Sequence, residues 1–471
     1  MNKYIKLSCI LLVTLFCSCG KKYLDLQQEK NQRVPTSLDD YQKLLDQTGV
    51  INQNCPVMFA NIGADEYWIP ASQYYLTTGS LPAANQINAY IWADQIYVGK
   101  EVQIDWNFGY NAIYLTNLGL EYINKTPRTD SSGAKWDRLK GSALFIRAFD
   151  FYNLAQLFSP VYSADNANLP LGISLRETSD PTVHVPRSTV GETYQKIVSD
   201  LNEALPLLNN QGANTFQAGK SAAYALLSRV YMQTGDYVSA EKAADSCLKI
   251  QPGLLDFNTL TIPTVATSPT FSAYMFGANN PEMIYMANPY LTQLFSWYHA
   301  DTTLLRSYEP DDIRLKAYFS DTTTSASANA IAFRGSYVGN SMTTYFCGLA
   351  TDEIYLNRAE CRARNQNTQG ALDDLNLLRK ARFTTGTYVP LQSTDVNQVM
   401  QWVLAERRKE LVMRGTRWAD LRRLNKETKY AATLVRVLND QRYELAPGSP
   451  KWVWPLPIEA ISNGGYTQNP R

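Results

Sequence analysis

Apolar residues recur every three to four positions in several separate stretches of the chain, and this spacing predicts amphipathic helices. The clearest stretch is 221–254, which has the length of one tetratricopeptide-like helix–turn–helix repeat. Its first helix presents Ser228 and Tyr231, its second presents Ala240 and Cys247, and a Gly-Asp pair turns the chain between them. Small residues at such positions let two helices approach closely, so this stretch predicts a packed helical pair.

Two further stretches have the same register. Residues 352–382 repeat it, with Arg362 where the repeat would have a tyrosine. A third unit is split: its helices are expected at 141–158 and 189–208, and a Pro-, Asn- and Ser-rich loop at 159–188 separates them. Because the units are not consecutive, the pattern predicts a mostly α fold: a tetratricopeptide-like helical-repeat scaffold with long irregular loop excursions and little β structure.

Two excursions interrupt the helical pattern, at about 60–105 and 253–350. Both are rich in Asn, Thr, Ser, Gly and aromatic residues, and neither shows a sustained helical period. Long irregular segments within a domain usually carry function. Their aromatic rings could face the C–H surfaces of a sugar, with Asn, Asp and Arg nearby, or they could pack in the core. The candidate ligand-binding residues are Tyr67, Trp68, Tyr74, Tyr75, Trp297 and Tyr298.

The N-terminus has the pattern of a secretory signal. Lys3 and Lys6 precede an apolar run at 7–16 that is shorter than the roughly 20 residues of a membrane span. The run ends in Phe-Cys-Ser-Cys, which resembles a bacterial lipobox. Cys19 follows a small serine, whereas Cys17 follows a bulky phenylalanine. We therefore expect residues 1–18 to be a lipoprotein signal peptide and Cys19 to carry a covalent lipid; the alternative is an ordinary signal peptide with two incidental cysteines.

Charge and cysteine content narrow the possible partners. The chain has 44 basic and 43 acidic residues, and removal of residues 1–18 takes away two lysines and no acid. A balance so close to neutral gives no reason to expect a nucleic-acid partner. The remaining cysteines show no metal-ligand spacing, and Cys247 and Cys361 fall in helical patterns where a small buried side chain is expected. The sequence therefore predicts no metal, and no cofactor besides the lipid.

The sequence gives little support for a catalytic function. His184 and His299 lie far apart without metal-ligand spacing. Paired carboxylates at Asp65–Glu66 or Asp311–Asp312 could be imagined to serve glycoside hydrolysis. Adjacent residues, however, rarely face one bond, and we expect Asp312 to form a structural ion pair with Arg314. The sequence therefore predicts a protein that is not an enzyme.

The basic stretch 404–424 could be read as a nucleic-acid-binding helix. Acids and bases alternate along it, however, with three pairs spaced three or four residues apart: Glu406–Lys409, Glu410–Arg414 and Asp420–Arg423. Such pairs meet on the surface of a helix. We therefore expect a structural helix, solvated or packed.

Several motifs occur in an order that resembles a known family. They begin with GSALFIRAFDFYNLAQLFSPVY and end with WVWPLP, and they lie at 141–162, 219–243, 352–382, 404–424 and 452–470. Together with the lipobox they resemble the SusD/RagB family of outer-membrane nutrient-binding lipoproteins, over nearly the whole chain. The resemblance implies one SusD-like domain at 19–471, with a C-terminal signature region at about 330–471.

The resemblance also implies a function: a lipid-anchored protein of the outer membrane, facing the cell exterior, that binds an oligosaccharide or polysaccharide and delivers it to a SusC-like TonB-dependent transporter. Three alternatives stay open, namely a peptide-binding RagB-like uptake protein, a repeat scaffold that binds only protein, and a surface glycosidase. One segment departs from the family. The Gly20–Lys22 segment after Cys19 lacks the acidic cluster that often marks surface export, so the family alone implies surface display.

Overall fold

Helices make up most of the fold. The structure is a computed structural model. It describes residues 35–76, 81–99, 105–262, 280–290, 298–324, 327–338 and 345–471. The predicted signal peptide, Cys19 and Trp297 lie outside the described residues, so the structure does not bear on those predictions.

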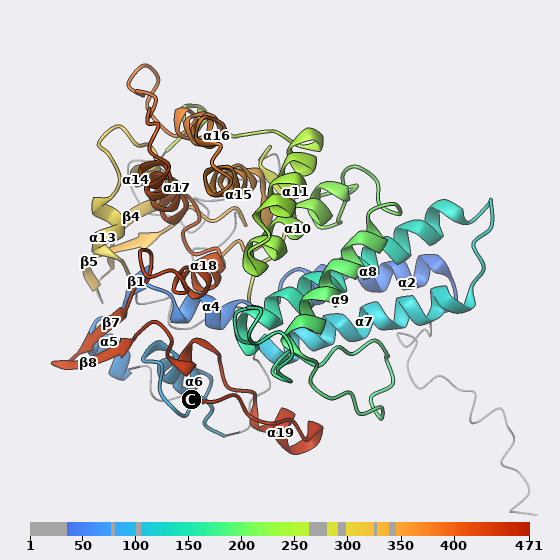
Figure 1. Cartoon of the computed structure of the whole chain (residues 1–471). Helices are drawn as coiled ribbons and strands as arrows, with labels where there is room; N and C mark the ends of the chain where they lie inside the picture. The colour runs from blue at the N-terminus through green and yellow to red at the C-terminus, as the bar shows by residue number, and fades with distance from the viewer. Residues whose placement is uncertain are drawn as a thin grey trace, which may run out of the picture.

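The predicted helical-repeat scaffold is confirmed. Its helices pack in succession, from α7 and α8 through α9, α10 and α11 to α15, which packs in turn on α16 and α17 (Figure 1). Their bounds are α7 Asp105–Lys125, α8 Gly133–Phe158, α9 Val190–Ala204, α10 Lys220–Thr234, α11 Tyr237–Ile250, α15 Thr351–Arg364, α16 Thr368–Lys380 and α17 Val396–Glu410. The split unit predicted at 141–158 and 189–208 corresponds to the second half of α8 and to α9, and residues 159–188 between them contain no helix.

Local sequence signals set the helix ends in this scaffold. Thr189 and Glu192 form a capping box, in which each side chain accepts a hydrogen bond from the backbone N–H of the other residue, and α9 begins there. Gly235 ends α10 with a left-handed backbone (φ 81°), a conformation that costs little only without a Cβ. The Asp236 carboxylate then accepts a hydrogen bond from the N–H of Ser239 and starts α11.

Shorter helices surround the scaffold. They are α2 Leu38–Leu45, α3 Thr48–Ile51, α4 Met58–Gly63, α5 Ala71–Leu76, α6 Leu81–Tyr90, η3 Phe257–Thr259, α13 Thr302–Arg306, α14 Arg314–Tyr318, α18 Thr416–Leu424, η5 Pro450–Trp452 and α19 Ile458–Gly464. The expectation that the two excursions are irregular is therefore wrong in part, because α5 and α6 lie within the first and α13 and α14 within the second. All six residues of α4 are buried, so this helix has no polar face that would give its sequence a helical period.

Strands are few in the described part of the chain, as predicted. They form two-stranded antiparallel pairs: β1 Tyr67–Trp68 with β3 His299–Ala300, β2 Met283–Tyr285 with β6 Leu349–Ala350, β4 Phe319–Thr324 with β5 Ser327–Phe333, and β7 Leu434–Leu438 with β8 Gln441–Leu445. The first pair joins the two excursions to each other. The second pair joins the second excursion to the start of α15.

The stretch 404–424 is broken rather than continuous. Helix α17 ends at Glu410 and α18 begins at Thr416. Between them Met413 and Gly415 have positive φ angles of 59° and 74°, which a right-handed helix does not allow. The expectation of a single structural helix over this stretch is therefore wrong.

The break also changes the ion pairs of this stretch. The predicted pairs Glu406–Lys409 (3.2 Å) and Asp420–Arg423 (2.9 Å) are present, because each lies within one helix. The third predicted pair is wrong. Arg414 lies in the break and pairs with Asp352 at 2.7 Å, while Glu410 is bound by other arginines.

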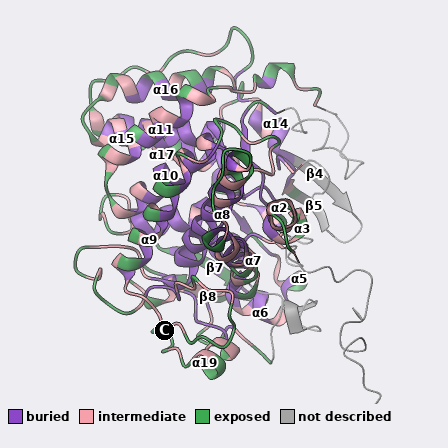
Figure 2. Ribbon diagram, turned by 90° about the vertical axis from the view of Figure 1, so that its right-hand side faces the viewer, coloured by how far each residue is buried: buried purple, intermediate pink, exposed green. Residues whose placement is uncertain are grey.

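Buried residues run through the middle of the molecule (Figure 2). The C-terminal segment contributes to this core. Trp418 of α18 stacks on Trp454 with ring centroids 5.0 Å apart, and Trp452 packs on the ring of Trp418. Trp452 and Trp454 are both buried, so the WVWPLP segment is a strap packed on the scaffold.

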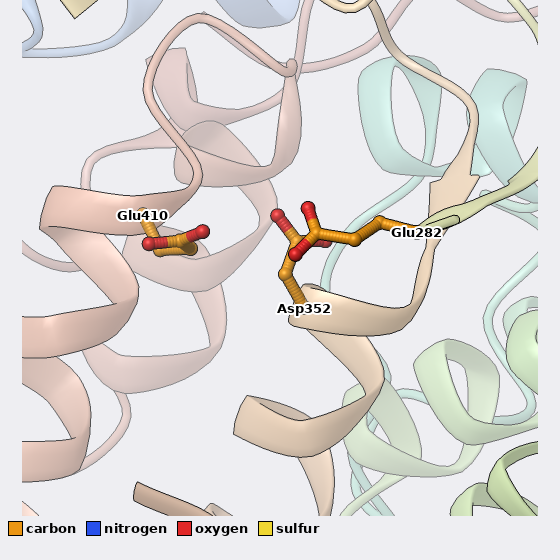
Figure 3. Close-up of side chains that lie close together, drawn as sticks. All are labelled: Glu282, Asp352 and Glu410. Carbon is orange, nitrogen blue, oxygen red and sulfur yellow. The ribbon is translucent and has the colours of Figure 1, made fainter. Parts of the chain in front are cut away.

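A network of buried charges joins the second excursion to the scaffold. Glu282 precedes β2, Asp352 lies at the start of α15 and Glu410 at the end of α17; all three are fully buried (Figure 3). Arg382 donates to Glu282 at 2.7 Å and to Glu410 at 2.6 Å. Arg414 donates a hydrogen bond to Asp352 at 2.9 Å, and the closest ion-pair contact between the two side chains is 2.7 Å.

Aromatic rings complete the surroundings of these arginines. The Arg382 guanidinium lies 4.1 Å from the centre of the Phe257 ring, and that of Arg414 lies 4.3 Å from the centre of the Tyr337 ring. The Tyr337 hydroxyl donates to Asp352 at 3.1 Å. Buried charges are tolerated only when they are paired and hydrogen-bonded, and here the partners come from distant parts of the sequence.

Removing one arginine from this network should be far more costly than removing a surface arginine. We expect Arg382→Met to lower the free energy of unfolding by about 3–5 kcal/mol, because Glu282 and Glu410 lose a buried counter-ion. Arg442 is the matched control, since its pair with Glu444 is 60% and 48% exposed. We expect Arg442→Met to cost about 0–1 kcal/mol. Urea unfolding measures both, and equal losses would contradict the structural role of the network.

Candidate functional site

The two excursions meet at the β1–β3 pair, and the meeting point exposes an aromatic surface. Trp68 lies directly opposite His299 in the register of this pair. Their rings stack, with centroids 4.4 Å apart and planes inclined by 25°. Because side chains alternate across a strand pair, the neighbouring residues Tyr67 and Ala300 face the core instead. Trp68 is 41% exposed, and its stacking on His299 holds its ring at the surface.

The other predicted ligand-binding residues are buried or lie outside the description. Tyr67, Tyr74 and Tyr298 are buried, at 3%, 6% and 4% exposure. Tyr67 packs edge-on against Tyr298 and its hydroxyl donates a hydrogen bond to the carbonyl of Ile62, so these two rings belong to the core. The side chain of Tyr75, like Trp297, lies outside the described residues. The structure thus brings residues of both excursions together, but of the four side chains described only that of Trp68 is open to solvent.

A hollow of about 270 Å³ adjoins the Trp68 ring. Its exposed side chains are Trp68, Val435 and Val437, and its buried ones include Tyr67, Tyr90, Trp92 and Arg436. The valines come from β7, which the sequence analysis did not connect with the excursions. We call this region, with Trp68, His299, Asp65 and Asp301, the Trp68 hollow.

Arg436 fixes β7 at the hollow. Its guanidinium lies 3.8 Å from the centre of the Tyr90 ring and donates to the carbonyls of Ile62 and Ala64 at 2.8 and 2.7 Å. This one buried side chain therefore links the β7–β8 hairpin to α4 and α6. The strand alternates buried and exposed residues, so Val435 and Val437 point outward on either side of Arg436.

Two carboxylates give the hollow a polar side. Asp65 receives paired hydrogen bonds from Arg417 at 2.7 and 2.9 Å, and Arg408 lies 3.3 Å away. Although burial opposes ionisation, Arg417 and Arg408 hold the pKa of Asp65 well below its usual range. Asp301 accepts from Arg408 at 3.1 Å and from the N–H of Leu304. Both carboxylates are thus fixed acceptors beside an aromatic surface.

His299 is a site residue that the sequence analysis missed. A single histidine in a loop is most often only polar surface, and nothing in the local sequence shows that it pairs with Trp68. Burial lowers the pKa of His299 below its ordinary value, so the imidazole is neutral near pH 7 and keeps one donor and one acceptor nitrogen. The role of His299 becomes visible only in the register of the β1–β3 pair, which joins segments more than 200 residues apart.

Among the described residues, one group of three carboxylates lies close enough together to suggest a metal site: Glu282, Asp352 and Glu410 (Figure 3). Arg382 and Arg414 already occupy the space and balance the charge of this group. Its chemistry is therefore that of a buried ion-pair network.

The carboxylate pairs considered for hydrolysis also have structural partners. The predicted ion pair between Asp312 and Arg314 is confirmed, with bonds of 2.9 and 2.6 Å, and both side chains are buried. In the other pair, Asp65 is bound by arginines, while Glu66 faces the core and accepts from the N–H of Met413 at 2.9 Å.

Comparison with known proteins identifies the class of this protein. Residues 22–232 match a family model described as starch-binding and associating with the outer membrane, and residues 351–471 match the model of the SusD family. The chain belongs to the SusD/RagB family. No curated protein matches its sequence significantly.

Solved structures share the fold over almost the full chain. A SusD superfamily protein from Bacteroides thetaiotaomicron is 21% identical, with a TM-score of 0.72, covering 93% of this chain and 100% of its own. A putative sugar binding protein from Bacteroides vulgatus is 22% identical (TM-score 0.71; 93% and 99% covered). A SusD-like carbohydrate binding protein from the same organism is 17% identical (TM-score 0.63; 92% and 97% covered). The TM-scores establish a common fold.

Family membership suggests a cell-surface or outer-membrane location. Within the described part of the chain, none of the helices combines the length and the apolar character that crossing a membrane requires.

Glu66 should make stability fall as the pH rises. Burial raises the pKa of Glu66 to about 7, above the value of about 4.3 in an unfolded chain. Its contribution to stability is complete below the unfolded pKa and is lost as the pH rises through the folded pKa. We expect Glu66→Gln to reduce the loss of unfolding free energy between pH 5 and pH 8 by about 1–3 kcal/mol.

Urea unfolding at a series of pH values measures this effect. Asp130 is exposed, and Asp130→Asn serves as the control that should leave the pH profile unchanged. An unaltered profile in Glu66→Gln would show that the buried carboxyl does not titrate in this range.

Proposed function

We propose that this protein binds a carbohydrate at the Trp68 hollow and delivers it to a SusC-like TonB-dependent transporter in the outer membrane. The observation that carries the proposal is the Trp68 ring, 41% exposed and stacked on His299 beside a hollow with fixed acceptors. The descriptions of the matched family and of two related structures, as starch-binding, sugar binding and carbohydrate binding, support the same ligand class.

A sugar ring matches the chemistry of this hollow. One face of a pyranose carries C–H groups, which pack on a flat aromatic surface, and its hydroxyls need acceptors and donors at the ring edge. Trp68 supplies the flat surface, while Asp65 and Asp301 supply acceptors fixed by Arg417 and Arg408. Because the Trp68 ring is already held by His299, little side-chain freedom is lost when a ligand stacks on it.

The exposed valines extend the same surface. Val435 and Val437 are 41% and 59% exposed and line the hollow with Trp68. An apolar edge of this kind is compatible with a glycan of several units, whose successive rings would lie across β7. Peptides are the second ligand class to test, because the family resemblance includes peptide-binding members.

The proposed partner follows from the need to move a captured solute across the membrane. A SusC-like barrel would provide the channel, and the repeat helices offer a broad surface for a large partner. We further propose that the protein is held at the membrane by a lipid on Cys19 and faces the exterior. The protein is proposed to act by binding alone, without turnover.

Two experiments test this function. Titration of the mature protein against a panel of oligosaccharides and peptides should give saturable binding to a carbohydrate without cleavage. Cleavage would favour a glycosidase, and binding to peptides alone would favour a RagB-like role. Gentle detergent extraction followed by affinity purification of the tagged protein should recover a barrel of transporter size. Recovery without such a barrel would count against the delivery role.

Trp68→Ala should weaken carbohydrate binding roughly 30-fold, since truncating an aromatic anchor at the centre of an interface costs about 2 kcal/mol or more. Tyr114→Ala is the matched control, because Tyr114 lies on α7 with 44% exposure and does not line the hollow. Calorimetric titration measures both affinities. Equal affinities for Trp68→Ala and the parent protein would remove the Trp68 hollow as the ligand site, and co-purification of the barrel should persist in either variant.

The anchor can be tested separately. A single acyl chain binds a membrane only marginally, whereas a lipidated N-terminal cysteine carries several chains. We expect Cys19→Ala to release the protein from the membrane fraction and Cys17→Ala to leave it there. Detergent-phase partitioning and mass determination of the mature N-terminus measure the outcome. Continued membrane association of the Cys19 variant would refute lipid attachment at this residue.

A further inference from the structure

A cavity of about 770 Å³ lies between α16, η3 and the loop that follows α16, and we call it the α16 cavity. It shares no lining residue with the Trp68 hollow, and α16 lies well apart from β1 and β7 (Figure 1). Sites for small ligands usually measure about 300–1,000 Å³. The α16 cavity falls within this range, so it is large enough to hold a ligand of its own.

Two asparagines that line the cavity hold the loop in place. On α16, Asn376 donates to the carbonyl of Leu391 at 3.0 Å and accepts from the N–H of the same residue at 2.8 Å. On η3, Asn258 donates to the carbonyl of Phe383 and accepts from the N–H of Thr385, both at 2.9 Å. Because the loop is bound from both sides, the cavity is formed before a ligand enters, and little ordering is needed on binding.

Tyr388 supplies a fixed aromatic surface in the cavity wall. The residue is half-buried and lines the cavity. Its ring packs on Phe383 with centroids 5.2 Å apart, and its hydroxyl donates to Oδ1 of Asn376. Leu377 also lines the cavity and is 47% exposed, so it adds apolar surface that is open to solvent.

The charged side chains that line the cavity are exposed, and they are Asp256, Asp373 and Lys380. Among the described residues, none of the three has an opposite charge within ion-pair distance. They differ in this respect from Asp65 and Asp301 in the Trp68 hollow, which are bound by arginines. The α16 cavity therefore offers a ligand both acceptors and a donor that no ion pair already occupies.

We propose that the α16 cavity is a second carbohydrate site. The C–H face of one sugar unit would pack on Tyr388 and Leu377, and its hydroxyls would bond to the charged side chains of the lining. A neutral sugar fits better than an acidic one, because two carboxylates and one ammonium group line the cavity. The ligand class rests on the proposed function, whereas the site itself does not depend on Trp68.

Leu377→Arg provides the sharpest test. The residue is exposed on a helix, arginine is a good helix former, and its long charged side chain would occupy the cavity without breaking the hydrogen bonds of the loop. Leu169→Arg is the matched control, because Leu169 is 45% exposed and does not line the cavity. Tyr388→Ala is the second variant, since it removes the aromatic surface but also the bond to Asn376.

The experiment is a ligand-observed NMR titration of the mature protein with maltohexaose, cellohexaose and xylohexaose. Maltohexaose comes first because the matched family model is described as starch-binding. All variants are made in the Trp68→Ala protein, so that binding at the Trp68 hollow does not mask the second site. We expect at least one hexasaccharide to bind saturably, Leu377→Arg and Tyr388→Ala each to weaken that binding about tenfold or more, and Leu169→Arg to leave it unchanged.

Three results would overturn the proposal: no binding of any hexasaccharide to the Trp68→Ala protein, binding only of peptides from a tryptic digest of casein, or unchanged affinity in a Leu377→Arg protein that retains its fold by circular dichroism. Failure of the Trp68 hollow as a ligand site looks different. The parent and the Trp68→Ala protein would then bind the sugar equally well, and both would still lose affinity on Leu377→Arg.

Discussion

The pairing of buried charges constrains this fold more than any other interaction. Arg382 and Arg414 are buried beside Glu282, Asp352 and Glu410, and these residues come from the second excursion, α15, the end of α17 and the loops that follow α16 and α17. A buried guanidinium without its carboxylate is strongly unfavourable, so the network forms as a whole or not at all. Arg414 makes its contact with Asp352 from the break that follows α17.

The helical scaffold could be predicted because its signals are local. Small residues such as Ser228 and Ala240 recur at helical spacing, and a Gly-Asp turn separates them. The spacing of charged residues predicted a wrong ion pair where a partner from a distant part of the sequence was preferred to one in the same stretch. Glu410 and Arg414 have the spacing of a helical ion pair, yet each finds a better partner elsewhere in the buried network. The short helix α4 could not be predicted from the sequence for a related reason. It is buried on all sides, so its residues show no alternation of apolar and polar positions with a helical period.

The candidate site was predictable only in part. Its aromatic content and its location in the excursions follow from composition, and Tyr67 and Tyr298 do meet at the β1–β3 junction. Which ring faces outward depends on the register of two-residue strands, and a shift by one residue would expose Tyr67 instead. The contributions of His299 and of the β7 valines arise from contacts between distant segments, and no local pattern in the sequence reveals them.

The two-residue strands β1 and β3 also have a consequence for how the protein matures. Trp68 and His299 are separated by about 230 residues, and closing so large a loop is entropically costly before other contacts hold it. During synthesis the N-terminal side of the chain emerges first, so Trp68 is made long before its partner His299. The helical pairs close early and locally. The Trp68–His299 pair therefore forms late, and a chain halted midway through synthesis would hold a partly folded scaffold without this stacked pair.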